Sequence, residues 1–187
     1  AMMPMTIETL LPAVPLPAPE VGRLTVYVSA RPIHELAFRS AAEMVANGGK
    51  LIVVDAAGCF DPERMTRSAR SGALDPAGLF KHLHILRAST CRALEETILT
   101  GLETAIDRIE TRRILIPDPL GSFYDSRIST RDAAQILGRV KSKLEVLAAC
   151  GAQIVVLCQS RSENLGTRSH FVLSLCALSS CSRHGGL

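Results

Sequence analysis

The chain reads Leu51-Ile-Val-Val-Asp55-Ala-Ala-Gly58-Cys-Phe60-Asp61-Pro62-Glu63-Arg64 at its most informative point. Four consecutive apolar residues from Leu51 predict a short strand that is buried on both faces, as in a parallel sheet. Gly58 marks a turn, and Asp61 before Pro62 predicts a helix with an acidic N-cap and proline at its first position. A buried strand that runs into a capped helix is the repeating unit of an α/β fold.

Strands and helices alternate along the rest of the chain. We predict strands over residues 24–29, 51–54, 82–87, 114–116, 153–158 and 171–178. We predict helices over residues 33–46, 61 onward, 75–80, 90–109 and 130–150. Strands joined by helices imply right-handed crossovers and a mostly parallel central sheet with helices on both faces.

Length and composition favour one domain. The 187 residues are 47% hydrophobic and include no Trp, so the core must consist mainly of aliphatic side chains. We place the α/β domain at residues 23–178, after a Pro-rich N-terminal arm over 1–22 and before a polar tail over 179–187. The start of the chain lacks the pattern of a secretory signal, and no apolar run approaches the ~20 residues that span a bilayer. We therefore expect a cytoplasmic protein without a membrane partner.

Charge and cysteine content are consistent with that expectation. The formal net charge of +3 is too small to indicate nucleic-acid binding by itself. The six cysteines are widely spaced and form no C-x-x-C pair, so we expect reduced thiols. Cys59 lies near a predicted helix start, but no neighbouring base supports thiol catalysis, and we expect it to be a buried structural residue.

Four pieces of the sequence, taken together, resemble the core of RecA/RadA-type recombinases. They are Lys50-Leu-Ile-Val-Val-Asp55-x-x-Gly58-x-Phe60-x-Pro62-Glu63-Arg64, Gly72-x-Leu74-Asp75-Pro76, His84-Ile-Leu-Arg87-Ala88 and Ile114-Leu-Ile-x-Asp118-Pro. Their order and spacing match across residues 22 to 160. The resemblance implies a RecA-like, P-loop NTPase-like three-layer α/β/α sandwich.

The residues that this family uses for ATP hydrolysis are largely replaced here. Between the first strand and helix, the family has a Gly-rich phosphate loop that ends in a Lys-Ser/Thr pair. This chain has no glycine there, places Ile33 and His34 where that pair belongs, and loses one N–H donor to Pro32. Ala57 stands where the family has a carboxylate that polarises the attacking water. The resemblance therefore implies a degenerate member that lacks the Walker A motif.

A remnant of the nucleotide site is still implied by the resemblance. Asp118 corresponds to the family's Mg²⁺-supporting Asp after the fourth core strand, and Gln159 corresponds to its switch residue at the end of the following strand. Arg31 lies at the degenerate phosphate loop and would supply the cationic group. These three residues are our candidate nucleotide-binding set, and we expect no bound cofactor and no catalytic residue.

Two loops correspond to those that hold single-stranded DNA in recombinases. The first covers 121–131 and the second, much shortened, covers 160–169. Our candidate DNA-binding residues are Arg127, Arg131, Arg161 and Arg168. Arginines at the carboxyl ends of parallel strands can contact phosphates, although solvated surface arginines are the simpler interpretation.

The two histidines of the predicted strand 82–87 are the remaining candidate for a site. His82 and His84 share one side of that strand, but no third ligand stands nearby, so we expect no metal. The leading hypothesis is a non-catalytic RecA/RadA-like domain that acts through protein–protein contacts, as a regulatory or accessory factor in DNA repair, recombination or the damage response. We expect protein partners and a homo-oligomer. Two alternatives stay open: a divergent nucleotide-binding ATPase, and an ATP-independent binder of single-stranded DNA.

Overall fold

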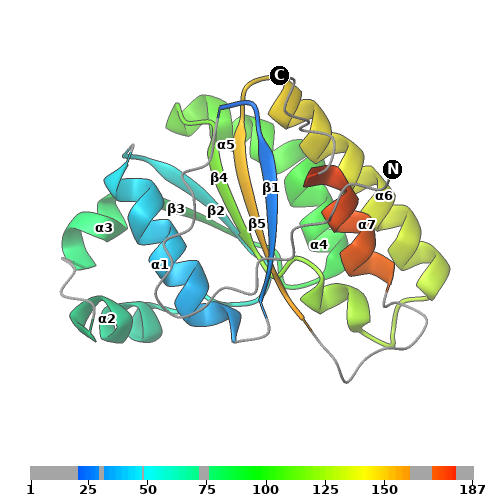
Figure 1. The fold of residues 1–187 in the computed structure, drawn as a ribbon, viewed down its shortest axis with the longest axis horizontal. Helices are drawn as coiled ribbons and strands as arrows, with labels where there is room; N and C mark the ends of the chain where they lie inside the picture. The colour runs from blue at the N-terminus through cyan, green and yellow to red at the C-terminus, as the bar shows by residue number, and fades with distance from the viewer. Residues whose placement is uncertain (1–20, 30–31, 48, 72–75, 161–169, 180–187) are drawn as a thin grey trace, which may run out of the picture.

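A five-stranded, all-parallel sheet forms the centre of the protein in the computed structural model (Figure 1). The structure describes residues 21–29, 32–47, 49–71, 76–160 and 170–179. The strands are β1 (Leu24–Ser29), β2 (Leu51–Asp55), β3 (Leu83–Arg87), β4 (Arg113–Pro117) and β5 (Gln153–Gln159). They lie in the order β1-β5-β4-β2-β3, and every neighbouring pair is parallel. The predicted α/β class with a parallel sheet is confirmed.

The strand β2 is buried along its whole length because β3 and β4 flank it and helices cover both of its faces. This environment explains its unbroken Leu-Ile-Val-Val sequence, since each side chain meets a packed layer whichever way it points. The predicted strands over 24–29, 51–54, 114–116 and 153–158 agree with the structure to within a residue at either end.

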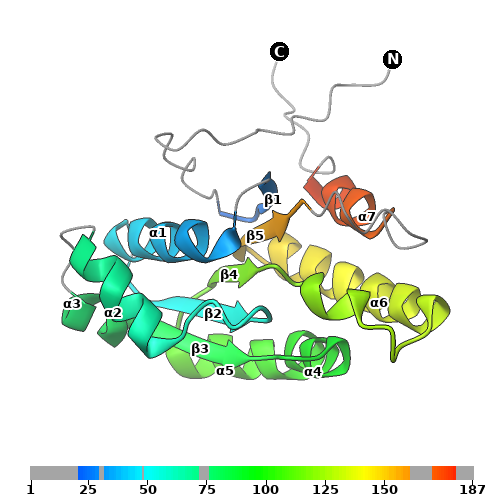
Figure 2. The same ribbon diagram turned by 90° about the horizontal axis from the view of Figure 1, so that it is seen from below.

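Three helices cover one face of the sheet. They are α1 (Ile33–Ala46), α2 (Pro62–Ser71) and α3 (Pro76–His82). Their inward residues pack with one set of strand side chains, including Leu36 from α1, Met65 from α2 and Leu79 from α3. Figure 2 shows these helices on the opposite side of the sheet from α4, α5 and α6.

A longer run of helices covers the other face. The predicted helix over 90–109 forms as α4 (Cys91–Glu96), a π-helical turn η1 (Thr97–Gly101) and α5 (Leu102–Ile109), and it begins with the Thr90 hydroxyl as N-cap. After a 3-10 turn η2 (Gly121–Tyr124), α6 (Thr130–Ala149) is capped in the same way by Ser129. The core on this face is the larger of the two.

The prediction of a final strand over 171–178 is wrong. The segment forms the helix α7 (His170–Ser179), whose Phe171, Leu175 and Cys176 are buried against the core on the side of α6. A continuous apolar run does not by itself distinguish a buried strand from a buried helix. The spacing of the buried residues fits one side of a helix, and no sixth strand occurs in the described part of the sheet.

Candidate functional site

The carboxyl edge of the sheet brings the predicted nucleotide-site residues into one region. Because β5 lies between β1 and β4, the ends of these three strands are neighbours. Ser29 of β1 is in register with Gln159 of β5, and the Ser160 N–H donates to the Ser29 carbonyl at 2.7 Å. Asp118, directly after β4, donates its own N–H to the Leu157 carbonyl at 2.6 Å. Two of the three predicted residues, Asp118 and Gln159, therefore adjoin, while Arg31 lies outside the described residues.

Asp118 is held tightly by its surroundings. Only 2% of the residue is exposed, and its carboxylate oxygen Oδ1 accepts a hydrogen bond from the Gln159 backbone N–H at 3.3 Å. Its φ of 43° lies in the left-handed region, which a residue with a Cβ adopts at some cost, although Asp tolerates it better than most. Its carbonyl closes the next turn by accepting from the Gly121 N–H. The side chain thus stabilises the junction between two strands.

The Asp118 carboxylate also affects a neighbouring thiol. Burial raises the pKa of the Cys158 thiol well above its usual value, and the negative charge of Asp118 and the nearby Cys176 raise it further. A thiol that stays protonated is a poor nucleophile and a poor metal ligand. Cys158 is therefore a core residue, and each cysteine that the structure describes is free of disulfides.

The start of α1 has no phosphate-binding character in the described residues. Ile33, which we predicted to stand where a phosphate-binding Lys would be needed, is 2% exposed and belongs to the core beneath α1. Pro32 stands at the N-cap position and provides no side-chain cap. His34 follows, and its Nδ1 is buried without a hydrogen-bond partner. Ala57, which we predicted to stand in place of a water-polarising carboxylate, packs against the same core.

A polar cluster that the sequence did not predict lies at the ends of the adjoining strands β2 and β3. The carboxylate of Asp55, at the end of β2, accepts hydrogen bonds from the backbone N–H groups of Cys59 at 2.8 Å and Phe60 at 3.1 Å. Arg87, at the end of β3, reaches the same carboxylate at 3.5 Å and donates to the Phe60 carbonyl at 3.0 Å. Cys59 is buried, as predicted. These contacts fold the 56–60 turn back over the strand ends and so set the position of α2.

The candidate DNA-binding arginines divide into two groups. Arg127 is exposed, and its guanidinium is bound to Asp125 at 2.6 Å within the same loop, which raises the pKa of Arg127. Arg131 is exposed in the first turn of α6. Arg161 and Arg168 lie outside the described residues. The loop 121–131 therefore presents two exposed arginines, of which Arg127 is paired with Asp125 of the same loop.

His82 and His84 do not lie on the same strand, so our prediction that they share one side of a strand is wrong. His82 is the last residue of α3, and His84 lies in β3. Burial lowers the pKa of His84, and the positive charges of Lys50, Arg108 and His82 lower it further. Within the described residues, no group of three or more His, Cys, Asp or Glu side chains could hold a metal ion.

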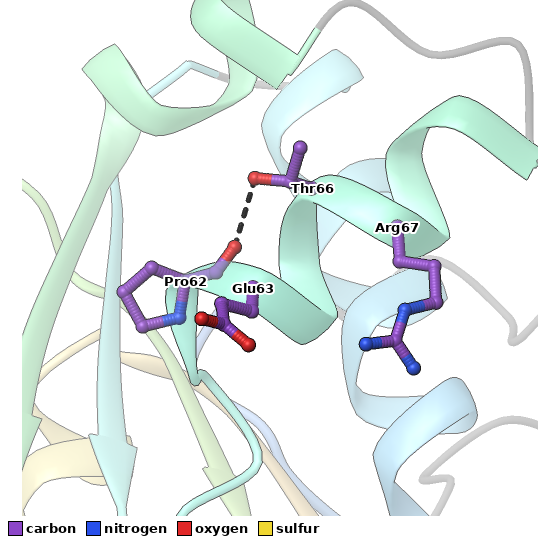
Figure 3. Close-up of a pocket in the computed structure, with 4 residues that line it drawn as sticks. All are labelled: Pro62, Glu63, Thr66 and Arg67. Atoms are coloured by element: carbon purple, nitrogen blue, oxygen red, sulfur yellow. Dashed lines mark hydrogen bonds between the residues drawn. The ribbon is translucent and has the colours of Figure 1, made fainter.

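Two hollows of the described surface lie away from the predicted residues. One, of about 440 Å³, is lined by Pro62, Glu63, Thr66 and Arg67 of α2, where the Thr66 hydroxyl donates to the Pro62 carbonyl (Figure 3). The other, of about 540 Å³, lies at the amino edge of the sheet between the starts of β4 and β5. There the Arg113 Nε donates to the Gln153 side chain at 3.2 Å. Neither hollow is lined by any of the predicted site residues.

No model of a known protein family matches the chain. The described residues include no helix with the length and apolar character needed to cross a membrane.

Proposed function

We propose that this chain is a RecA/RadA-like domain that does not hydrolyse ATP and that works through contacts with other proteins. Its role would be regulatory or accessory, in DNA repair, recombination or the damage response. Both parts of this proposal start from the sequence resemblance, and the geometry of the carboxyl edge supports them.

The order of the strands supports the RecA-like assignment. The family's site needs the turn after the first strand, the Asp after the fourth core strand and the polar residue ending the next strand to be neighbours. The order β1-β5-β4 brings Ser29, Asp118 and Gln159 together at one edge. Ligands of open α/β sheets bind at this edge.

The loss of ATP hydrolysis rests chiefly on Ile33. A phosphate-binding lysine must project from its helix start toward the ligand, whereas Ile33 is turned into the core at 2% exposure. Asp118 also directs Oδ1 to the Gln159 backbone within the protein. A domain with this edge would retain the fold of an ATPase and use its outer surface for binding.

Nucleotide binding is the first test. We expect no change in melting temperature and no heat of binding when the full chain is titrated with millimolar ATP or GTP in the presence of Mg²⁺. The Asp118→Asn variant serves as the matched control, because it would remove a real Mg²⁺ contact while keeping the size of the side chain. Saturable binding that this substitution abolishes would favour the alternative of a divergent ATPase.

Partner binding is the second test. We expect the immobilised full chain to bind the purified recombinase of the same organism without nucleotide and with little dependence on salt. Failure to bind either the free recombinase or its filament on DNA would overturn the accessory role in recombination. Salt-sensitive binding to an oligonucleotide alone, lost in an Arg127→Ala/Arg131→Ala double variant, would favour the single-stranded DNA alternative.

A further inference from the structure

We draw no further inference here: the strongest candidate, the hollow of about 540 Å³ at the amino edge of the sheet, carries nothing because Arg113, whose buried Nη1 has no hydrogen-bond partner, and Asp107 of α5 line it from opposite faces of the sheet, and nothing in the structure shows what would occupy it.

Discussion

Asp55 and Asp118 end two neighbouring central strands at the same edge of the sheet, and each is 2% exposed, yet their environments differ. The Asp55 carboxylate accepts from two backbone N–H groups in the turn that follows it and also meets Arg87. The Asp118 carboxylate accepts from the Gln159 N–H on β5 at the longer distance of 3.3 Å, and the Asp118 backbone adopts a positive φ. Two equally buried carboxylates at one edge of the sheet therefore differ in their hydrogen-bond partners and in their backbone conformation.

Asp55 and Asp118 also differ in backbone strain. Backbone strain persists where the surrounding structure over-determines it, and it is concentrated at functional sites. Asp55 shows no such strain and closes its own turn, which is a purely structural task. Asp118 combines a left-handed backbone with a partner on β5, as expected of a position that joins two strands.

Removing the Asp55 carboxylate should have the largest effect. In Asp55→Ala, the buried N–H groups of Cys59 and Phe60 lose their acceptor, and each such charge-assisted bond contributes about 1.5–3 kcal/mol. We expect the free energy of unfolding to fall by roughly 3 kcal/mol or more, measured by urea denaturation. Asp55→Asn should lose about half as much, because its single carbonyl oxygen can serve one N–H. If both variants lose the same free energy of unfolding, the negative charge of Asp55 and not its number of acceptor oxygens stabilises the turn.

Substitutions of Asp118 should have a smaller effect that depends on backbone conformation. Asp118→Ala removes the bond to Gln159 and leaves a Cβ at positive φ, so we expect a loss of about 2 kcal/mol in the free energy of unfolding. Asp118→Gly removes the same bond but relieves the strain, so it should stay within about 1 kcal/mol of wild type. Urea denaturation of both variants measures the difference. If the glycine variant is as unstable as the alanine variant, the positive φ carries no strain.

Much of the fold could be predicted because local signals and burial agree. The apolar run at 51–54 and the Asp61-Pro62 helix start were sufficient to place β2 and α2. α7 was mistaken for a strand because its sequence has no charged residue to mark an outer side. The π-helical turn at Thr97–Gly101 leaves the helical periodicity of the sequence intact, so nothing in that pattern indicated it.

The sequence predicted the positions of candidate-site residues only where those residues lie at or directly after the end of a strand. Asp118 and Gln159 could be placed together because the carboxyl ends of parallel strands meet at one edge. The Asp55 and Arg87 contact could not, since these residues lie 32 positions apart and nothing local links them. The positive φ of Asp118 likewise depends on the adjoining strand β5, because its N–H and its carboxylate both bond there.

Substitutions of Arg87 test whether the ion pair or the N–H groups of the 56–60 turn hold the Asp55 carboxylate in place. The Arg87 side chain is 58% exposed, so water screens its attraction to the carboxylate. We expect Arg87→Ala to lower the free energy of unfolding by about 1 kcal/mol, mainly through the lost bond to the Phe60 carbonyl. Arg87→Lys should lose nearly as much, since lysine lacks the forked geometry that reaches both oxygens. If an Arg87 variant loses as much free energy of unfolding as Asp55→Ala, the ion pair and not the N–H groups stabilises the turn.

The smallest effect concerns the dependence of stability on pH, and we assign it to His84. The pKa of His84 is lowered in the folded protein by burial and by Lys50, Arg108 and His82, so the unfolded chain takes up a proton at higher pH than the folded one. His84 therefore contributes stability above its usual pKa of 6.5, and that contribution is lost as the pH falls below 6.5 toward the lowered value. Thermal unfolding between about pH 7 and pH 5 should show a declining melting temperature in wild type and a flatter profile in His84→Gln, and an unchanged profile would assign the decline to other groups.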